Sequence, residues 1–153
     1  MKSIHRSFIA IALLLSFGLM ACSNYGKKVA VSGTKAEVYY KGDGVTKDEA
    51  IKVGNFLKET GFFSNDKEAS AQLVKEGDDY VVRFVYDKEY YEKTKGLDAI
   101  FQLFGAKMSK DLFDNKKVNI ALADKYFKDY KSIPYSETAA SDPEKPEGEE
   151  PAK

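Results

Sequence analysis

The sequence contains no tryptophan, one histidine and one cysteine among its 153 residues. The histidine, His5, and the cysteine, Cys22, both stand near the N-terminus, ahead of the part that is expected to fold. A histidine-based catalytic triad, a cysteine–histidine pair and the usual zinc or copper ligand sets need side chains that this part lacks. We therefore predict that the chain is not an enzyme and that it holds no metal or other cofactor.

The sequence also lacks an excess of charge of one sign and an apolar run long enough to span a membrane. The 24 basic residues equal the 24 acidic ones, so no strong positive field arises and no nucleic-acid partner is expected. The longest apolar run, Phe8 to Met20, has 13 residues, whereas a helix that spans a bilayer needs about 20. Because Lys2 and Arg6 precede this run, it is typical of a secretory signal peptide.

The four residues after the run are more specific. Leu19-Met20-Ala21-Cys22 resembles the lipobox of bacterial lipoproteins, in which a leucine stands three positions before a cysteine that receives a diacylglyceryl group. Only Met20 departs from the commonest pattern. The resemblance implies that residues 1–21 are a signal peptide and that acyl chains on Cys22 hold the mature protein on a membrane. The alternative is an ordinary signal peptide that leaves Cys22 as a stray thiol or bonded to another chain.

The residue after the cysteine bears on the choice of membrane. Ser23 is not the aspartate that resembles an inner-membrane retention signal in bacteria with two membranes. The outer membrane is therefore expected for a host that has two.

Both ends of the mature chain are predicted to lie outside the folded part. Residues 22–35 show no convincing periodicity and are expected to form a lipidated tether. Residues 136–153 are rich in glutamate and proline, with no aliphatic side chain larger than alanine, and are predicted to be disordered. A single domain over residues 36–135 remains.

The predicted domain has elements with clear periods. Thr46-x-x-Glu49 is a capping box that begins the first helix, and Gly61 is expected at its left-handed C-cap. A second helix over 97–113 carries an apolar stripe. Strands are predicted where apolar and polar residues alternate, over residues 36–41, 69–75, 80–86 and 118–122.

The order of these elements predicts the fold class. Strand, helix, strand, strand, helix, strand is the order of an α+β, ferredoxin-like βαββαβ sandwich, with an antiparallel sheet and two helices on one face. Asp124 is expected to cap a short C-terminal helix that carries Tyr126, Phe127 and Tyr130.

The other face of the sheet is the candidate site. It should display a mixed set of side chains: Tyr39, Val81, Arg83, Val85, Asn119 and Ala121. A binding surface is predicted from one arginine and four tyrosines, because amphipathic rings bury a large area at little cost in entropy. Its residues are Tyr39, Arg83, Tyr86, Tyr90 and Tyr91.

We therefore expect an anchored envelope protein that binds a protein partner, or a second copy of itself, through this sheet face. A module for glycan or peptidoglycan fragments is the alternative. A third possibility is a hydrolase that uses carboxylates as its catalytic groups, because paired carboxylates can cleave glycosides. The candidate carboxylates are Glu76, Asp78, Asp79 and Asp87. The segments Gly42-Asp43-Gly44 and Gly77-Asp78-Asp79 are interpreted as turns, because neither follows the pattern of a calcium-binding loop. Calcium binding by their acidic side chains is the alternative.

Overall fold

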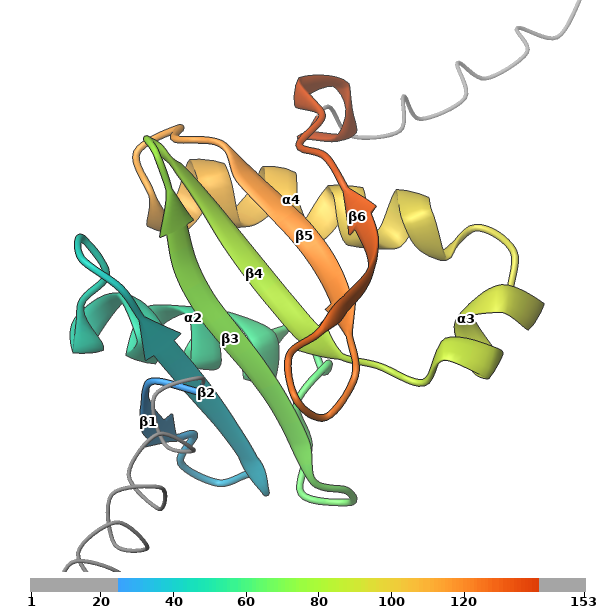
Figure 1. Ribbon diagram of the computed structural model, residues 1–153, viewed down its shortest axis with the longest axis horizontal. Helices are drawn as coiled ribbons and strands as arrows, with labels where there is room; N and C mark the ends of the chain where they lie inside the picture. Colours follow the sequence, from blue (N-terminus) through green and yellow to red (C-terminus); the bar gives the residue numbers. More distant parts are fainter. Residues whose placement is uncertain (1–24, 141–153) are drawn as a thin grey trace, which may run out of the picture.

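The computed structural model describes residues 25–140. They form one six-stranded mixed sheet in which the strands follow one another in sequence order. Helices α2 and α4 cover one face of this sheet (Figure 1). The elements are β1 (Lys27–Ala30), β2 (Ala36–Lys41), α2 (Lys47–Glu59), β3 (Ala69–Glu76), β4 (Asp79–Val85), α3 (Lys88–Lys93), α4 (Leu97–Leu112), β5 (Val118–Ala123), β6 (Asp129–Ile133) and the 3-10 helix η3 (Glu137–Ala140).

Helix α2 begins and ends as its sequence predicts. The backbone N–H of Glu49 donates to Thr46 Oγ1 at 3.2 Å, and the N–H of Thr46 donates to Glu49 Oε2 at 2.7 Å. Both bonds of the capping box are therefore present, and they satisfy two backbone donors that a helix start leaves without partners. Gly61, with a φ of +75°, lies beyond the C-terminal end in the left-handed region.

The core lies between the two helices and the sheet. Its side chains come from alternate strand positions, such as Val38, Leu73, Val82 and Ile120, and from one stripe on each helix. On α4 this stripe includes Phe101 and Met108, so the predicted aromatic face of the second helix is core. Asp114 and Asn115 end α4 with φ values of +51° and +63°, a conformation that these two residue types tolerate better than most.

The α+β class is confirmed, and the predicted strands and helices from β2 to β5 occur in the predicted order, with α3 in addition, but the ferredoxin-like arrangement is wrong. In a split βαβ unit a third strand lies between the two strands that the helix connects. Here β2 pairs directly with β3, and β4 with β5, both in parallel. The sheet is therefore mixed, and the antiparallel strands β1 and β6 extend it at its two edges.

The predicted tether contains the first of these edge strands. Val29 pairs with Val38 of β2, and both Val29 and Val31 are buried against the core. The folded part thus begins at least as early as Tyr25, although residues 22–35 were expected to be a tether. The strand has only four residues and a single inward side chain, too little alternation to stand out in the sequence.

The second edge strand replaces the predicted C-terminal helix. Asp124 does not cap a helix; its Oδ1 accepts hydrogen bonds from the backbone N–H groups of Tyr126 and Lys128, at 2.8 and 3.0 Å. Phe127 has a φ of +57°, and the chain turns back into β6. Aspartate side chains stabilise turns and helix starts through the same kind of bond, so the residue type alone does not decide between the two.

A buried tyrosine ties the start of α2 to the sheet. Tyr80 donates from its hydroxyl to Glu49 Oε1 at 2.6 Å and stacks on Phe113 at 4.0 Å between ring centroids. Burial first, and then the hydrogen bond to the Glu49 carboxylate, raise the pKa of Tyr80 to about 12. The folded protein therefore holds this proton at a pH where the unfolded chain, with a pKa near 10, releases it.

Stability should consequently fall as the pH rises from about 10 to about 12. A folded-state pKa above the unfolded one stabilises the protein fully below the lower value, and this contribution is lost through the window between them. The expected loss is about 2–3 kcal/mol in the free energy of unfolding. Urea denaturation on both sides of this window should show a shallower decline for Tyr80→Phe, whereas Tyr126→Phe, which alters an exposed ring, should follow the wild type. Equal slopes for all three proteins would contradict the assignment.

Candidate functional site

The sequence predicts an open sheet face on the side away from the helices, but this face is not open. At its centre Val74, Val81 and Ala121 keep only 9%, 6% and 3% of their surface exposed. Two segments remote in sequence meet over its β2 side, the N-terminal Tyr25 and the loop between β5 and β6. The Phe127 ring of this loop lies 5.7 Å from the Tyr25 ring and 5.3 Å from the Tyr39 ring.

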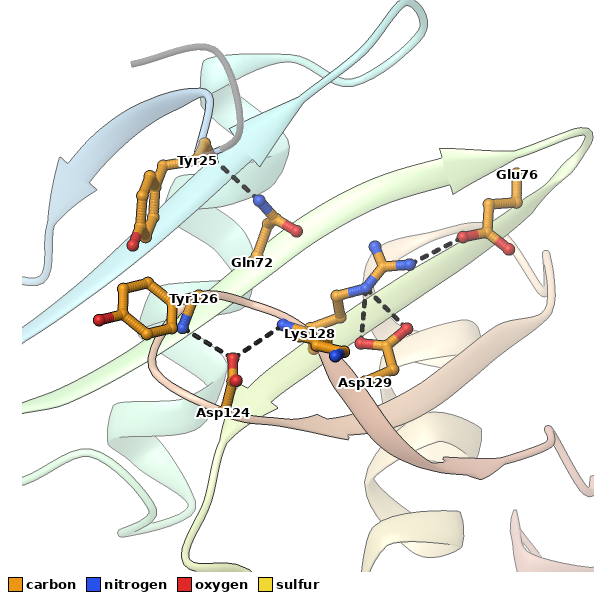
Figure 2. A network of polar contacts seen from close by, with 8 residues as sticks. Tyr25, Gln72, Glu76, Asp124, Tyr126, Lys128 and Asp129 are labelled. Atoms are coloured by element: carbon orange, nitrogen blue, oxygen red, sulfur yellow. Dashed lines mark hydrogen bonds and ion pairs between the residues drawn. The ribbon is translucent and has the colours of Figure 1, made fainter. Parts of the chain in front are cut away.

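Tyr25 is fixed by its backbone as well as by its ring. The buried Gln72 side chain donates from Nε2 to the Tyr25 carbonyl oxygen at 3.0 Å (Figure 2). The Tyr25 ring also lies 5.8 Å from the Tyr39 ring. The chain therefore enters the domain on this sheet face, at a defined place.

Arg83 is engaged by acids of its own chain. Its Nε donates to both carboxylate oxygens of Asp129, at 2.9 and 3.0 Å, and its Nη2 donates to Glu76 at 2.9 Å (Figure 2). Ala121 is the β5 neighbour of Arg83 in the register, and its small side chain lets the guanidinium reach across β5 to β6. The arginine thus holds the edge strand to the sheet, because charge-assisted bonds of this kind are strong and directional.

A groove of about 460 Å³ runs between the β5–β6 loop and the end of β2. Its floor includes Gln72 and Val74, and its wall includes Tyr126 and Phe127. The charged residues along it are four cations and two anions: Lys41, Lys75, Arg83, Lys128, Glu76 and Asp129. Both anions bind Arg83, and the Lys75 amine lies over the Tyr80 ring at 5.5 Å from its centroid, so the positive surplus of the groove comes from Lys41 and Lys128.

The five residues predicted as a binding surface fall into two groups. Tyr39 and Arg83 lie on the sheet face, where the Tyr39 hydroxyl donates to Glu37 at 2.9 Å. A hydrogen bond from Lys28 to Glu37 lowers the pKa of that carboxyl. Near α3 lie Tyr86, Tyr90 and Tyr91, and there the Tyr86 ring packs edge-on against Phe101 of the core. The structure therefore does not bring the five together into one surface.

The group near α3 also contains a tyrosine that the sequence analysis did not select. Tyr130 of β6 donates from its hydroxyl to the Tyr86 carbonyl oxygen at 3.2 Å, and its ring lies 6.3 Å from the Tyr91 ring. Burial first, and then the nearby Asp87 carboxylate, raise the pKa of Tyr130 to about 12. These contacts fasten the α3 segment to the sheet edge.

Two of the four acids considered for hydrolysis have side-chain partners within the fold. Glu76 binds Arg83, and Asp87 caps α3 by accepting from the backbone N–H of Tyr90 at 2.6 Å. Asp79 is the register partner of Glu76 at the end of the β3–β4 hairpin. Within residues 25–140, no three acidic, histidine or cysteine side chains come close enough to hold a metal ion.

The residues that the sequence analysis missed are those of the groove wall and of the chain entry, above all Tyr25, Tyr126 and Phe127. In the sequence these residues are aromatic side chains near lysines. Tyr25 was assigned to the predicted tether, and Tyr126 and Phe127 were assigned to the predicted C-terminal helix. Cys22 and the lipobox lie outside the described residues. No helix within the described part of the chain combines the length and the apolar character needed to cross a bilayer.

Comparison with known proteins places this domain in a family. No curated protein and no solved structure matches the chain. The model of the family AF_1994_N, described as a family N-terminal domain, matches residues 28–134. The match covers more than half of the chain and extends from β1, of which it leaves out only Lys27, to the end of β6, so the sheet belongs to one family domain. The chain belongs to the AF_1994_N family.

Proposed function

We propose that the protein is an exported lipoprotein, held on a membrane surface by acyl chains on Cys22, and that its domain is a non-enzymatic module that binds an envelope protein. One observation carries this proposal. The lipobox cysteine precedes Tyr25, the first described residue, by three positions. Cleavage before Cys22 would therefore remove the apolar run and leave the whole sheet intact, with the domain tied closely to its lipid. Ser23 favours the outer membrane in a host that has two.

The contacts among the charged side chains of the sheet face argue against hydrolysis and against the glycan alternative. Glu76 and Asp129, the two carboxylates along the groove, both accept hydrogen bonds from Arg83. Glycoside hydrolysis needs two carboxyl groups that face one bond of the substrate, one of them as a proton donor. Two carboxylates that both bind the Arg83 guanidinium stabilise the fold rather than act on a substrate. The same contacts occupy Arg83, which the glycan alternative requires as a ligand.

The helix layer offers an apolar contact to a protein partner. Ile100 and Leu103 lie nearly one turn apart on α4 and are 49% and 36% exposed. Buried α4 residues such as Phe101 and Met108 point to the core, so Ile100 and Leu103 lie on the outer side of the helix. A short chain that ties the sheet face to the lipid leaves this outer side accessible from the aqueous compartment. The partner is expected there, rather than on the sheet face that the sequence analysis selected.

Substitution of Leu103 tests this surface. In crosslinked native membranes, Leu103→Asp should lose the complex that the wild-type protein forms, because a charge cannot be buried unpaired in an apolar contact. We expect at least about a tenfold loss of recovered complex, equivalent to about 1.4 kcal/mol.

The matched control is Ile51→Asp, which replaces an isoleucine of α2 that is exposed to a similar extent. This variant should retain the complex. The mass of the crosslinked species distinguishes an envelope protein from a second copy of the chain. Equal recovery with both variants, or no reproducible complex with the wild type, would overturn the proposed function.

A further inference from the structure

We propose that the sheet face around Tyr25 and the β5–β6 loop lies directly on the headgroups of the bilayer, and that anionic lipids are the ligand of this surface. The surface consists of Tyr25, Lys41, Lys125, Tyr126, Phe127 and Lys128. The inference rests on the proposed lipid anchor, and it adds a second, noncovalent contact between the domain and the same membrane.

The length of chain between the lipid and the fold carries the first step. Tyr25 is held to Gln72 through its carbonyl oxygen and to Phe127 through its ring. Tyr25 lies three positions after Cys22, and an extended chain spans at most about 3.6 Å per position, or about 11 Å in all. A tether that continued to residue 35 would allow more than about 40 Å. The described domain therefore has almost no freedom to stand away from an anchored Cys22.

The β5–β6 loop supplies the groups that membrane interfaces favour. Tyr126 is 62% exposed, and the Lys125 amine lies over its ring at 5.1 Å from the centroid. Tyrosine is enriched where a membrane meets water, because the ring is apolar and the hydroxyl is wet. The next residue, Phe127, contacts the Tyr25 ring, so the loop lies beside the point where the chain enters the domain.

The loop presents these groups on a fixed backbone. Asp124 accepts hydrogen bonds from the N–H groups of Tyr126 and Lys128, which closes the turn between β5 and β6 (Figure 2). The Asp124 carboxylate is thereby directed toward its own loop, whereas Lys125 and Lys128 are exposed. Little ordering entropy is then lost when the loop meets a surface.

The charge of the surface matches anionic headgroups. Along the groove the two carboxylates are held by Arg83, and Lys41 and Lys128 lie at its sides. Near an anionic surface each lysine contributes about 1 kcal/mol. The contact thus combines interfacial rings with a positive surplus, and it directs the helix layer away from the membrane.

A single indole reports the contact, since the natural sequence has no tryptophan. The full-length protein is isolated with its lipid and reconstituted in vesicles of phosphatidylglycerol and phosphatidylcholine that carry bromine near the top of the acyl chains. With Tyr126→Trp, the emission should shift to the blue and lose most of its intensity. With Ile51→Trp, the control at an exposed position of α2 in the helix layer, position and intensity should stay unchanged. In vesicles of phosphatidylcholine alone, the loss for Tyr126→Trp should be smaller.

Flotation of the same samples distinguishes the proposed lipid anchor on Cys22 from the proposed contact between the sheet face and the headgroups. Protein that floats with the vesicles while Tyr126→Trp is not quenched would overturn the inference and leave the anchor intact. A blue shift without bromine quenching would mean that protein, a second copy included, covers the surface, and would also overturn it. Protein that does not float would overturn the anchor itself. Equal quenching with and without phosphatidylglycerol would exclude anionic lipid as the ligand.

Discussion

Gly105→Ala is expected to lower the free energy of unfolding by about 2 kcal/mol, although alanine is the better helix former by about 1 kcal/mol. A Cβ on Gly105 would lie 2.6 Å from the backbone carbonyl oxygen of Val118. That oxygen belongs to β5, an inner strand whose backbone is paired with β4 and β6. Because the sheet cannot move locally, α4 must shift away from it, and overpacking of this kind costs about 1–3 kcal/mol or more.

The matched control is Gly54→Ala in α2. A Cβ at Gly54 would meet Val31 Cγ2 at 2.7 Å and Val38 Cγ2 at 3.3 Å. These atoms belong to side chains, and Val31 follows the edge strand β1, so the neighbours can adjust by small rotations. We expect a clearly smaller loss than for Gly105→Ala. Urea denaturation followed by circular dichroism measures both, and a Gly105→Ala variant as stable as the wild type would contradict the close packing of α4 on β5.

Cys22→Ser is expected to abolish lipidation and processing completely. In the proposed lipoprotein a diacylglyceryl group is joined to Cys22 through a thioether, which a hydroxyl does not form, and the lipobox resemblance implies that cleavage follows modification. Each buried methylene is worth about 0.8 kcal/mol, so several acyl chains anchor a protein stably where one chain binds only marginally. The variant should take up no labelled fatty acid and should retain residues 1–21.

Ser23→Ala provides the control, because it changes the neighbouring residue and leaves the thiol in place. This variant should be labelled and shortened like the wild type. Labelling in living cells followed by electrophoresis shows both effects. A Cys22→Ser protein that is shortened at the same site and still labelled would refute the lipobox assignment.

Local signals predicted helices α2 and α4 but not the six-residue helix α3, and the pairing of the strands depends on long-range contacts that local signals do not show. Thr46 and Glu49 are three residues apart, so their reciprocal hydrogen bonds can be inferred from the sequence alone. The choice of β3 rather than another strand as the parallel neighbour of β2 depends on contacts across the whole sheet. For this reason the predicted elements from β2 to β5 occur in the correct order, whereas the two edge strands were not predicted and the ferredoxin-like strand arrangement was wrong.

For the candidate site, too, local patterns predicted some features, and long-range contacts determined the others. Alternation placed Tyr39 and Arg83 on one sheet face, and the structure confirms this. That Asp129 would neutralise Arg83 depends on a strand formed where a helix was expected. The contact between Tyr25 and Phe127 joins the two ends of the domain, and no local pattern reveals such a contact.

Mass spectrometry of the N-terminal peptide from protein isolated out of native membranes tests the anchored state most directly. We expect the mature chain to begin at Cys22 and to carry the added mass of a diacylglyceryl group. A chain that begins at another residue, or a Cys22 without lipid, would contradict the account.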